Sequence, residues 1–122
     1  YGIVGNDQAR QPFADEAAAD FMARYTLGLR RGSRCSTARL DRMIYDYSSA
    51  CYYETIYIQG GSLIDDARRR MGSTAFWNAM RGYVAPNRNG LIGNIDLLRA
   101  LDAATSTDLG ATMFKPRFPS LY

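Results

Sequence analysis

Histidine is absent from the 122 residues of this chain. Catalytic pairs of the Ser/His or Cys/His type need an imidazole as general base, so the sequence excludes them here. No apolar run approaches the roughly 20 residues that a membrane-spanning helix needs, so no membrane span is expected. A glycine-rich phosphate loop is lacking as well. Composition by itself therefore favours no catalytic class.

Lysine occurs once, at Lys115, and arginines supply the other positive charges, for a net charge of +3. The arginines cluster in two places: Arg30, Arg31 and Arg34, and then Arg68, Arg69 and Arg70. Nucleic acid or an anionic surface would bind such clusters, but no RGG, RNP or helix-turn-helix signature accompanies them. Asp65 and Asp66 precede Arg69 and Arg70 at the spacing of ion pairs within a helix. We therefore expect solvated helix faces and no nucleic-acid partner.

The cysteines are Cys35 and Cys51, whose separation does not suit a metal site in a chain without histidine. They either form a disulfide or are two unrelated buried thiols. We favour the disulfide, because it would close an irregular, tyrosine-rich stretch and stabilise the fold by about 3 kcal/mol through chain entropy. A disulfide implies an oxidising setting, so we expect an extracytoplasmic or secreted protein.

Helical periodicity dominates the rest of the chain. Apolar residues recur every three or four positions in segments 18–29, 56–71, 76–84, 95–101 and 109–114. We expect the first helix to end at Gly32, and a break at 86–90. Predicted helix caps are Ser73 or Thr74, then Asn94, then Ser106 or Thr107. No segment alternates strongly like a strand, so the prediction is one all-α domain over residues 1–122, with about five or six helices.

Gly60 and Gly61 stand inside the second apolar stripe. Each glycine in a helix costs about 1 kcal/mol relative to alanine, so two in succession need a structural reason. A close helix crossing, or room for a ligand, would supply one.

Two segments near the start of the chain carry a resemblance to a known family. Residues 1–8 read Y-G-I-V-G-N-D-Q and residues 12–17 read P-F-A-D-E-A. They resemble the stretch just after the HExxH zinc motif in the aminopeptidase-N family of gluzincin zinc metallopeptidases. In that family the glutamate of the second segment is the third zinc ligand, which implies this role for Glu16. The resemblance also implies that the chain is a fragment starting just after the HExxH helix.

Later segments follow the family in the same order. Residues 53–61, Y-E-T-I-Y-I-Q-G-G, are similar to its Y-x-K-G-[AG] segment, whose tyrosine hydrogen-bonds the oxyanion of the tetrahedral intermediate. The resemblance gives this role to Tyr57. Residues 63–83, 95–98 and 107–114 resemble its remaining helices. The chain departs from the pattern at Phe13-Ala14, Ala17 and Gln59, and the stretch around Cys35 to Cys51 has no family counterpart.

The resemblance thus implies the helical second half of a thermolysin-like catalytic domain that hydrolyses peptide bonds with zinc. The isolated fragment lacks HExxH, so we expect it to be inactive and to hold no zinc. Its implied partners are a peptide substrate and the missing N-terminal half of the catalytic domain. We also expect self-association through the groove that this half would cover. The alternative is a non-catalytic helical interaction module, or a degenerate relative of the peptidases.

Overall fold

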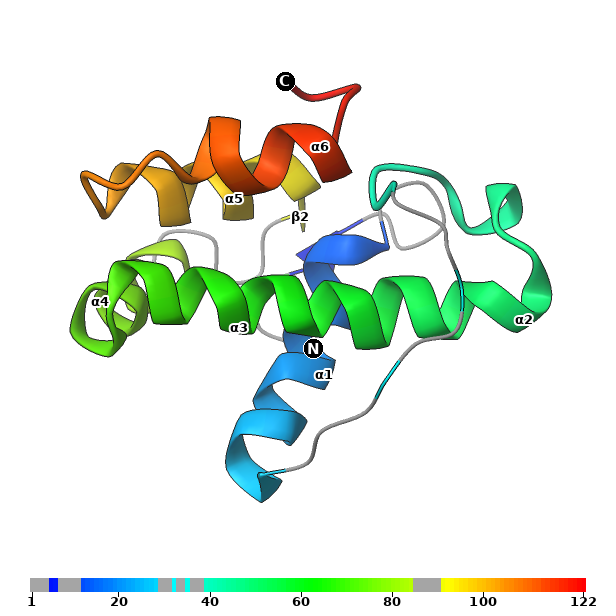
Figure 1. Ribbon diagram of the computed structural model, residues 1–122, viewed down its shortest axis with the longest axis horizontal. Helices are drawn as coiled ribbons and strands as arrows, with labels where there is room; N and C mark the ends of the chain where they lie inside the picture. The colour runs from blue at the N-terminus through cyan, green and yellow to red at the C-terminus, as the bar shows by residue number, and fades with distance from the viewer. Residues whose placement is uncertain (1–4, 7–11, 29–31, 33–34, 36–38, 85–90) are drawn as a thin grey trace.

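The computed structural model describes residues 5–6, 12–28, 32, 35, 39–84 and 91–122 (Figure 1). Helices make up most of this part, which confirms the predicted all-α class. The elements are β1 (Gly5–Asn6), α1 (Phe13–Leu27), the 3-10 helix η1 (Ile44–Asp46), α2 (Ser49–Tyr52), the π-helix η2 (Tyr53–Gln59), α3 (Gly60–Met71), α4 (Ser73–Val84), β2 (Leu91–Ile92), α5 (Asn94–Ala103), the π-helix η3 (Gly110–Phe114) and α6 (Lys115–Arg117). No helix in these ranges is both long enough and apolar enough to span a membrane.

The elements α2, η2 and α3 follow one another without a break and form one long helix, the longest rod in Figure 1. Helix α1 crosses this rod and packs against both η2 and α3. Helix α4 follows at Gly72, whose positive φ of 88° allows the change of direction, and packs on α5. The elements η3 and α6 complete the layer that contains α5. The long helix is therefore the scaffold against which the N-terminal helix is fixed.

The glycine pair marks the place where α1 meets the long helix. A Cβ atom on Gly60 would lie 2.7 Å from the Cβ of Ala17, and one on Gly61 would lie 2.8 Å from Oδ2 of Asp20. Neither position leaves room for a side chain, so the close helix crossing expected from the sequence is confirmed. This crossing brings the backbone of α1 directly against the start of α3.

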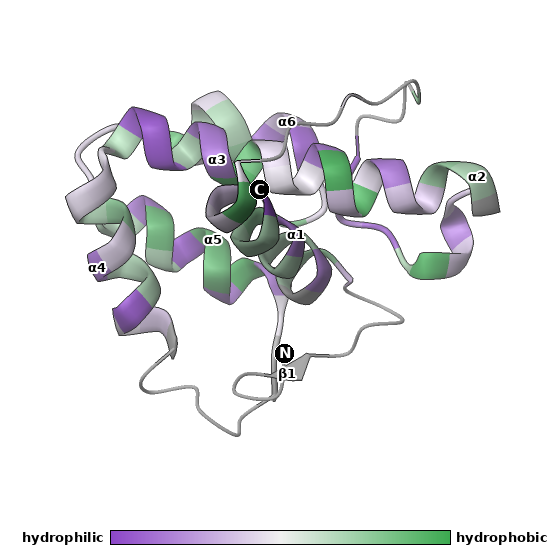
Figure 2. Ribbon diagram, turned by 90° about the horizontal axis from the view of Figure 1, so that it is seen from below, coloured by the Kyte–Doolittle hydropathy of each residue, from purple (hydrophilic) through white to green (hydrophobic). Residues whose placement is uncertain are grey.

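One apolar core joins α1, η2, α3, α4, α5 and η3. Five phenylalanines are fully buried in it: Phe13, Phe21, Phe76, Phe114 and Phe118. The Phe13 and Phe118 rings meet edge to face at 4.7 Å, which ties the first helix to the end of the chain. Figure 2 shows the hydrophilic stretches of α3 on the outside of the molecule. In α3 the amphipathic pattern read from the sequence is thus the pattern that packs, whereas Met22 and Tyr25 of the apolar stripe in α1 are 43% and 48% exposed.

Several predicted helix ends are wrong by a few residues. Helix α1 ends at Leu27, because Gly28 adopts the left-handed conformation (φ 69°) that terminates helices, so the predicted end at Gly32 is corrected. Ser73 and Thr74 lie within α4 and are not its caps. At η3 the Asp102 and Asp108 carboxylates accept hydrogen bonds from the backbone N–H groups of residues 109–111. These carboxylates take the place of the predicted Ser106 or Thr107 cap. The predicted break at 86–90 lies outside the described residues.

Asn94 caps a different helix from the one predicted. It is the first residue of α5, and its Oδ1 accepts a hydrogen bond from the backbone N of Ala14, 2.9 Å away in α1. The carboxylate of Asp96 accepts from the backbone N of Gly93 and satisfies the start of α5. Just before these two helices, β1 and β2 pair in parallel over two residues each. The starts of α1 and α5 are thereby held together across the sequence.

Candidate functional site

Glu16 lies at the end of the first turn of α1 and is 8% exposed. Two hydrogen bonds at the start of α1 fix its position. The backbone N of Glu16 donates to the carbonyl of Pro12 at 3.0 Å, and Asn94 caps the helix two residues earlier. The neighbouring Ala17 packs against Gly60. The predicted zinc ligand is therefore a buried carboxylate beside the helix crossing.

Tyr57 lies in η2 and is half-buried within a group of tyrosines. The ring of Tyr53 stacks on it with a centroid distance of 4.8 Å, and the ring of Tyr52 meets it edge to face at 6.1 Å. Tyr47 extends the row, since its ring lies 6.1 Å from that of Tyr52. The predicted oxyanion donor is thus one member of a row of four tyrosines.

Both predicted site residues act on Tyr52. Burial and, second to it, the negative charge of Glu16 raise the pKa of the Tyr52 phenol. The same ring contacts Tyr57. We call Glu16, Tyr52, Tyr53 and Tyr57 the tyrosine site. Sequence reasoning missed Tyr52 and Tyr53, although the run of tyrosines at 52, 53 and 57 was a visible signal.

The backbone around Tyr57 is π-helical, which the apolar periodicity did not reveal. Seven residues, Tyr53–Gln59, adopt this wider helix before the α-helix resumes at Gly60. Such segments inside α-helices are rare and occur frequently at functional sites. From α1, Nη2 of Arg24 donates to the carbonyl of Ile58 in this segment at 3.0 Å. The local shape therefore depends on contacts distant in sequence.

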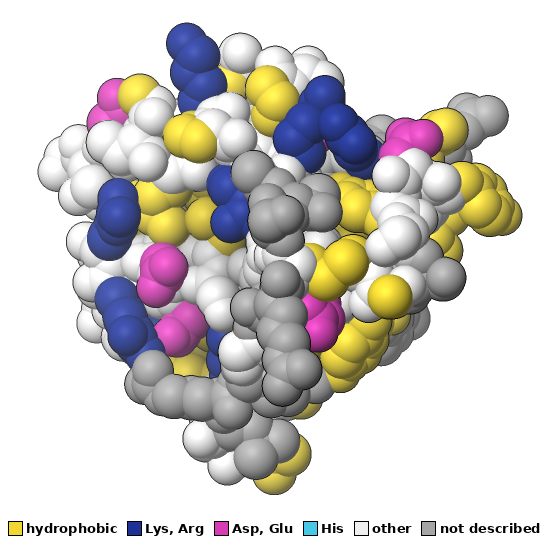
Figure 3. Space-filling view, turned by 45° about the vertical axis from the view of Figure 1, so that its right-hand side comes forward, with side chains coloured by type: hydrophobic (Ala, Val, Ile, Leu, Met, Phe, Trp, Pro, Cys, Tyr) yellow, Lys and Arg dark blue, Asp and Glu magenta, His cyan; other side chains and the backbone are white. Residues whose placement is uncertain are grey.

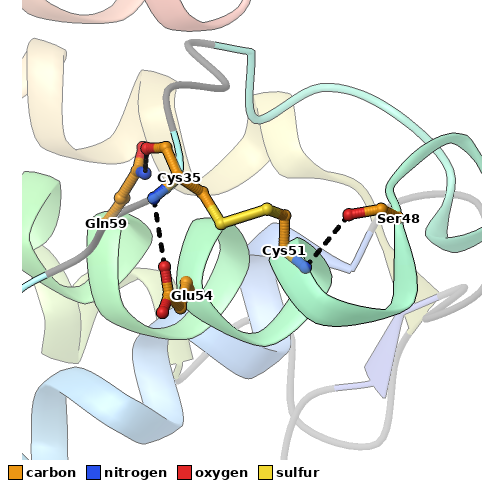
Figure 4. Close-up of a disulfide and its surroundings, with 5 residues drawn as sticks. All are labelled: Cys35, Ser48, Cys51, Glu54 and Gln59. Carbon is orange, nitrogen blue, oxygen red and sulfur yellow. Dashed lines mark hydrogen bonds between the residues drawn. A yellow bond between two sulfur atoms is a disulfide. The ribbon is translucent and has the colours of Figure 1, made fainter.

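The disulfide predicted between Cys35 and Cys51 is present (Figure 4). It holds Cys35 beside η2, where the Glu54 carboxylate accepts from the Cys35 backbone N at 3.1 Å. Nε2 of Gln59 donates to the Cys35 carbonyl at 2.8 Å, and its Oε1 accepts from Arg117 at 2.7 Å. Gln59 is the position where the resembled family has lysine. Here it joins the disulfide segment to the C-terminal segment.

No group of three or more His, Cys, Asp or Glu side chains in the described ranges is arranged to hold a metal ion. Glu16 supplies one carboxylate, whereas catalytic zinc takes three protein ligands. These residues therefore do not make a zinc site by themselves.

The second arginine cluster behaves as a solvated helix face. Arg68 and Arg69 each form an ion pair with Asp65 at 2.9 Å, and Arg68 also lies over the Tyr25 ring. On the face shown in Figure 3, basic and acidic side chains are interspersed. The first cluster, Arg30, Arg31 and Arg34, lies outside the described residues.

No protein-family model, curated protein or solved structure matches this chain.

Proposed function

We propose that this chain is part of a zinc-dependent metallopeptidase of the aminopeptidase type, the helical second half of its catalytic domain. What supports the proposal most is that Glu16 and Tyr57, chosen from separate sequence motifs, both act on Tyr52: the charge of Glu16 raises the pKa of its phenol, and the Tyr57 ring packs against its ring. They come from α1 and η2, two elements that pack against each other at a glycine crossing. An arrangement of one carboxylate and one phenol in this order is what the resembled family uses.

Each residue has a distinct role in the proposal. Glu16 contributes one carboxylate ligand, and its burial in a capped helix keeps that carboxylate in place. Zinc in such enzymes acts as a Lewis acid and lowers the pKa of a bound water. Tyr57 donates its phenol O–H to the oxygen of the substrate carbonyl as negative charge develops there. Burial on one side and stacking on Tyr53 restrict the ring to few orientations.

The remaining ligands and the general base come, in this proposal, from an HExxH helix in another part of the polypeptide. This 122-residue chain alone should therefore show no peptidase activity and bind no zinc stoichiometrically. The disulfide Cys35–Cys51 favours an oxidising, extracytoplasmic location for the protein.

The test compares two tyrosine variants in the full-length polypeptide, assayed with aminoacyl and peptide substrates. Tyr57→Phe removes the donor but keeps the ring, so kcat should fall by about 100-fold or more. Tyr53→Phe is the matched control, because this neighbour stacks on Tyr57 and is 46% exposed. It should leave kcat within about threefold, since it removes no group from the reacting carbonyl. Equal effects of the two substitutions, or an inactive wild-type protein, would refute the proposal.

A further inference from the structure

Arg24 makes an unusual set of contacts for an arginine on the first helix. From α1, Nη1 donates to the hydroxyl of Ser62 in α3 at 2.7 Å. Nη2 donates to the carbonyl of Ile58 in η2 at 3.0 Å and pairs with Asp20 at 3.3 Å. The Arg24 side chain is 12% exposed, so these contacts are largely removed from water. One guanidinium thus joins α1 to both sides of the junction at which the π-helix becomes an α-helix.

Two features indicate that this geometry is fixed by the contacts of the Nη atoms. First, Nε of Arg24 is buried without a hydrogen-bond partner among the residues that the structure describes. A buried N–H left unpaired is unfavourable, so the other contacts must outweigh it. Second, a side chain on Gly61 would meet both Asp20 and Arg24, at 2.8 Å and 3.4 Å. The glycine leaves the space that the Asp20–Arg24 pair occupies.

We propose that Arg24 is a positioning residue, which holds the π-helical segment that carries Tyr57 at a fixed place relative to α1 and Glu16. The carbonyl that it binds belongs to Ile58, the residue directly after Tyr57. Its ion-pair partner Asp20 lies one helical turn after Glu16. The consequence for catalysis rests on the proposed function, whereas the structural part does not.

The planar guanidinium is what lets a single side chain reach three acceptors. Lysine carries the same charge as a point ammonium and cannot reproduce this fork. Arg24→Lys can keep the charge near Asp20 but should lose contacts to Ile58 and Ser62. Arg24→Met should lose all three. Arg81→Met is the matched control, because Arg81 is an exposed arginine of α4 that donates to Asn78 of its own helix.

The first readout is amide hydrogen exchange in the 122-residue chain. Arg24→Lys should speed exchange in residues 53–59 by about tenfold or more relative to residues 63–71, because only η2 loses a backbone contact. Arg81→Met should change neither segment. Uniform acceleration along the whole long helix, or no change in η2, would overturn the positioning role. Because the lysine variant retains the charge, it decides the question even if Arg24→Met does not fold.

The second readout is steady-state kinetics in the full-length polypeptide. Displacement of Tyr57 by about 1 Å should lower kcat on the order of 100-fold for Arg24→Met, with a smaller loss for Arg24→Lys. KM should stay within about threefold, since the substrate contacts of the ground state remain. If the wild-type protein is active and kcat of Arg24→Met is unchanged, the positioning role of Arg24 is overturned and the proposed function is not. An inactive wild-type protein would instead refute the proposed function, and the exchange experiment would still decide the role of Arg24.

Discussion

The segments η2 and α3 of the long helix are adjacent in sequence, but different kinds of contacts stabilise them. In α3 the outward ion pairs are local, between Asp65 and the arginines three and four residues later. In η2 the polar contacts come from distant segments, through Arg24, Cys35 and Arg117. The comparison teaches that the outward face of α3 pairs within its own helix, with Arg24–Ser62 as a distant contact near its start, whereas the polar contacts of η2 come from distant segments. The segment that depends on the fold is the one that carries Tyr57.

Removing the disulfide should have the largest effect on this contrast. The double variant Cys35→Ser, Cys51→Ser should lose about 3 kcal/mol of unfolding free energy, because a loop of this length is no longer closed. Urea denaturation measures this loss. Hydrogen exchange should accelerate more in η2 than in α3, since Glu54 and Gln59 lose a fixed partner. Chemical reduction of the wild-type chain serves as the control, and equal protection of the two segments would break the comparison.

The glycine crossing should come next. Gly60→Ala places a Cβ 2.7 Å from Ala17, so the overpacked crossing should cost about 1–3 kcal/mol in denaturant unfolding. Gly82→Ala is the matched control, because a Cβ at this position in α4 would meet nothing within 4 Å. It should stabilise the protein by roughly 0.5–1 kcal/mol through helix propensity. Stabilisation by both substitutions would show that α1 does not need the close approach.

The tyrosine row gives a prediction for alkaline pH. Burial raises the pKa of Tyr47 to about 12, from an ordinary value near 10. The folded state therefore favours the neutral phenol, and the stability linked to it is complete below pH ~10 and is lost as pH rises through about 12. Tyr47→Phe should remove this alkaline loss, and it should cost about 1 kcal/mol at pH 7 through the hydrogen bond to the Arg39 carbonyl. Absorbance titration near 295 nm and denaturation at pH 7, 9 and 11 test both parts.

The smallest effect is expected on the exposed face of α3. Asp65→Asn removes the ion pairs to Arg68 and Arg69, whose side chains are 19% and 46% exposed. The loss should be below about 1 kcal/mol and should shrink further in 0.5 M salt, because surface pairs are screened. A loss as large as that of Gly60→Ala would mean that α3 also relies on specific polar contacts.

These contrasts explain what the sequence could predict. The all-α class, the core face of α3 and the close crossing at Gly60 follow from local periodicity and glycine placement. The π-helical segment cannot be predicted in this way, because its residues have an ordinary helical pattern. Its partners lie up to 58 positions away, at Arg117. The sequence likewise predicts Asn94 as a cap of its own helix. Its Oδ1 instead accepts from the backbone N of Ala14, 80 positions away. Of the candidate site, the family resemblance predicts Glu16 and Tyr57, whereas the effect of the Glu16 charge on Tyr52 emerges only from the packing of α1 on η2.

The most direct test of the central claim is the zinc content of the full-length polypeptide with and without Glu16. After dialysis against a weak chelator, metal analysis of the wild-type protein should give about one zinc per chain, since an intact site of three ligands binds tightly. Glu16→Gln should lose most of this zinc. Glu54→Gln is the control, because the Glu54 carboxylate accepts from the Cys35 backbone N, and this variant should retain the zinc. Equal zinc content in all three proteins, or none in the wild type, would contradict the account.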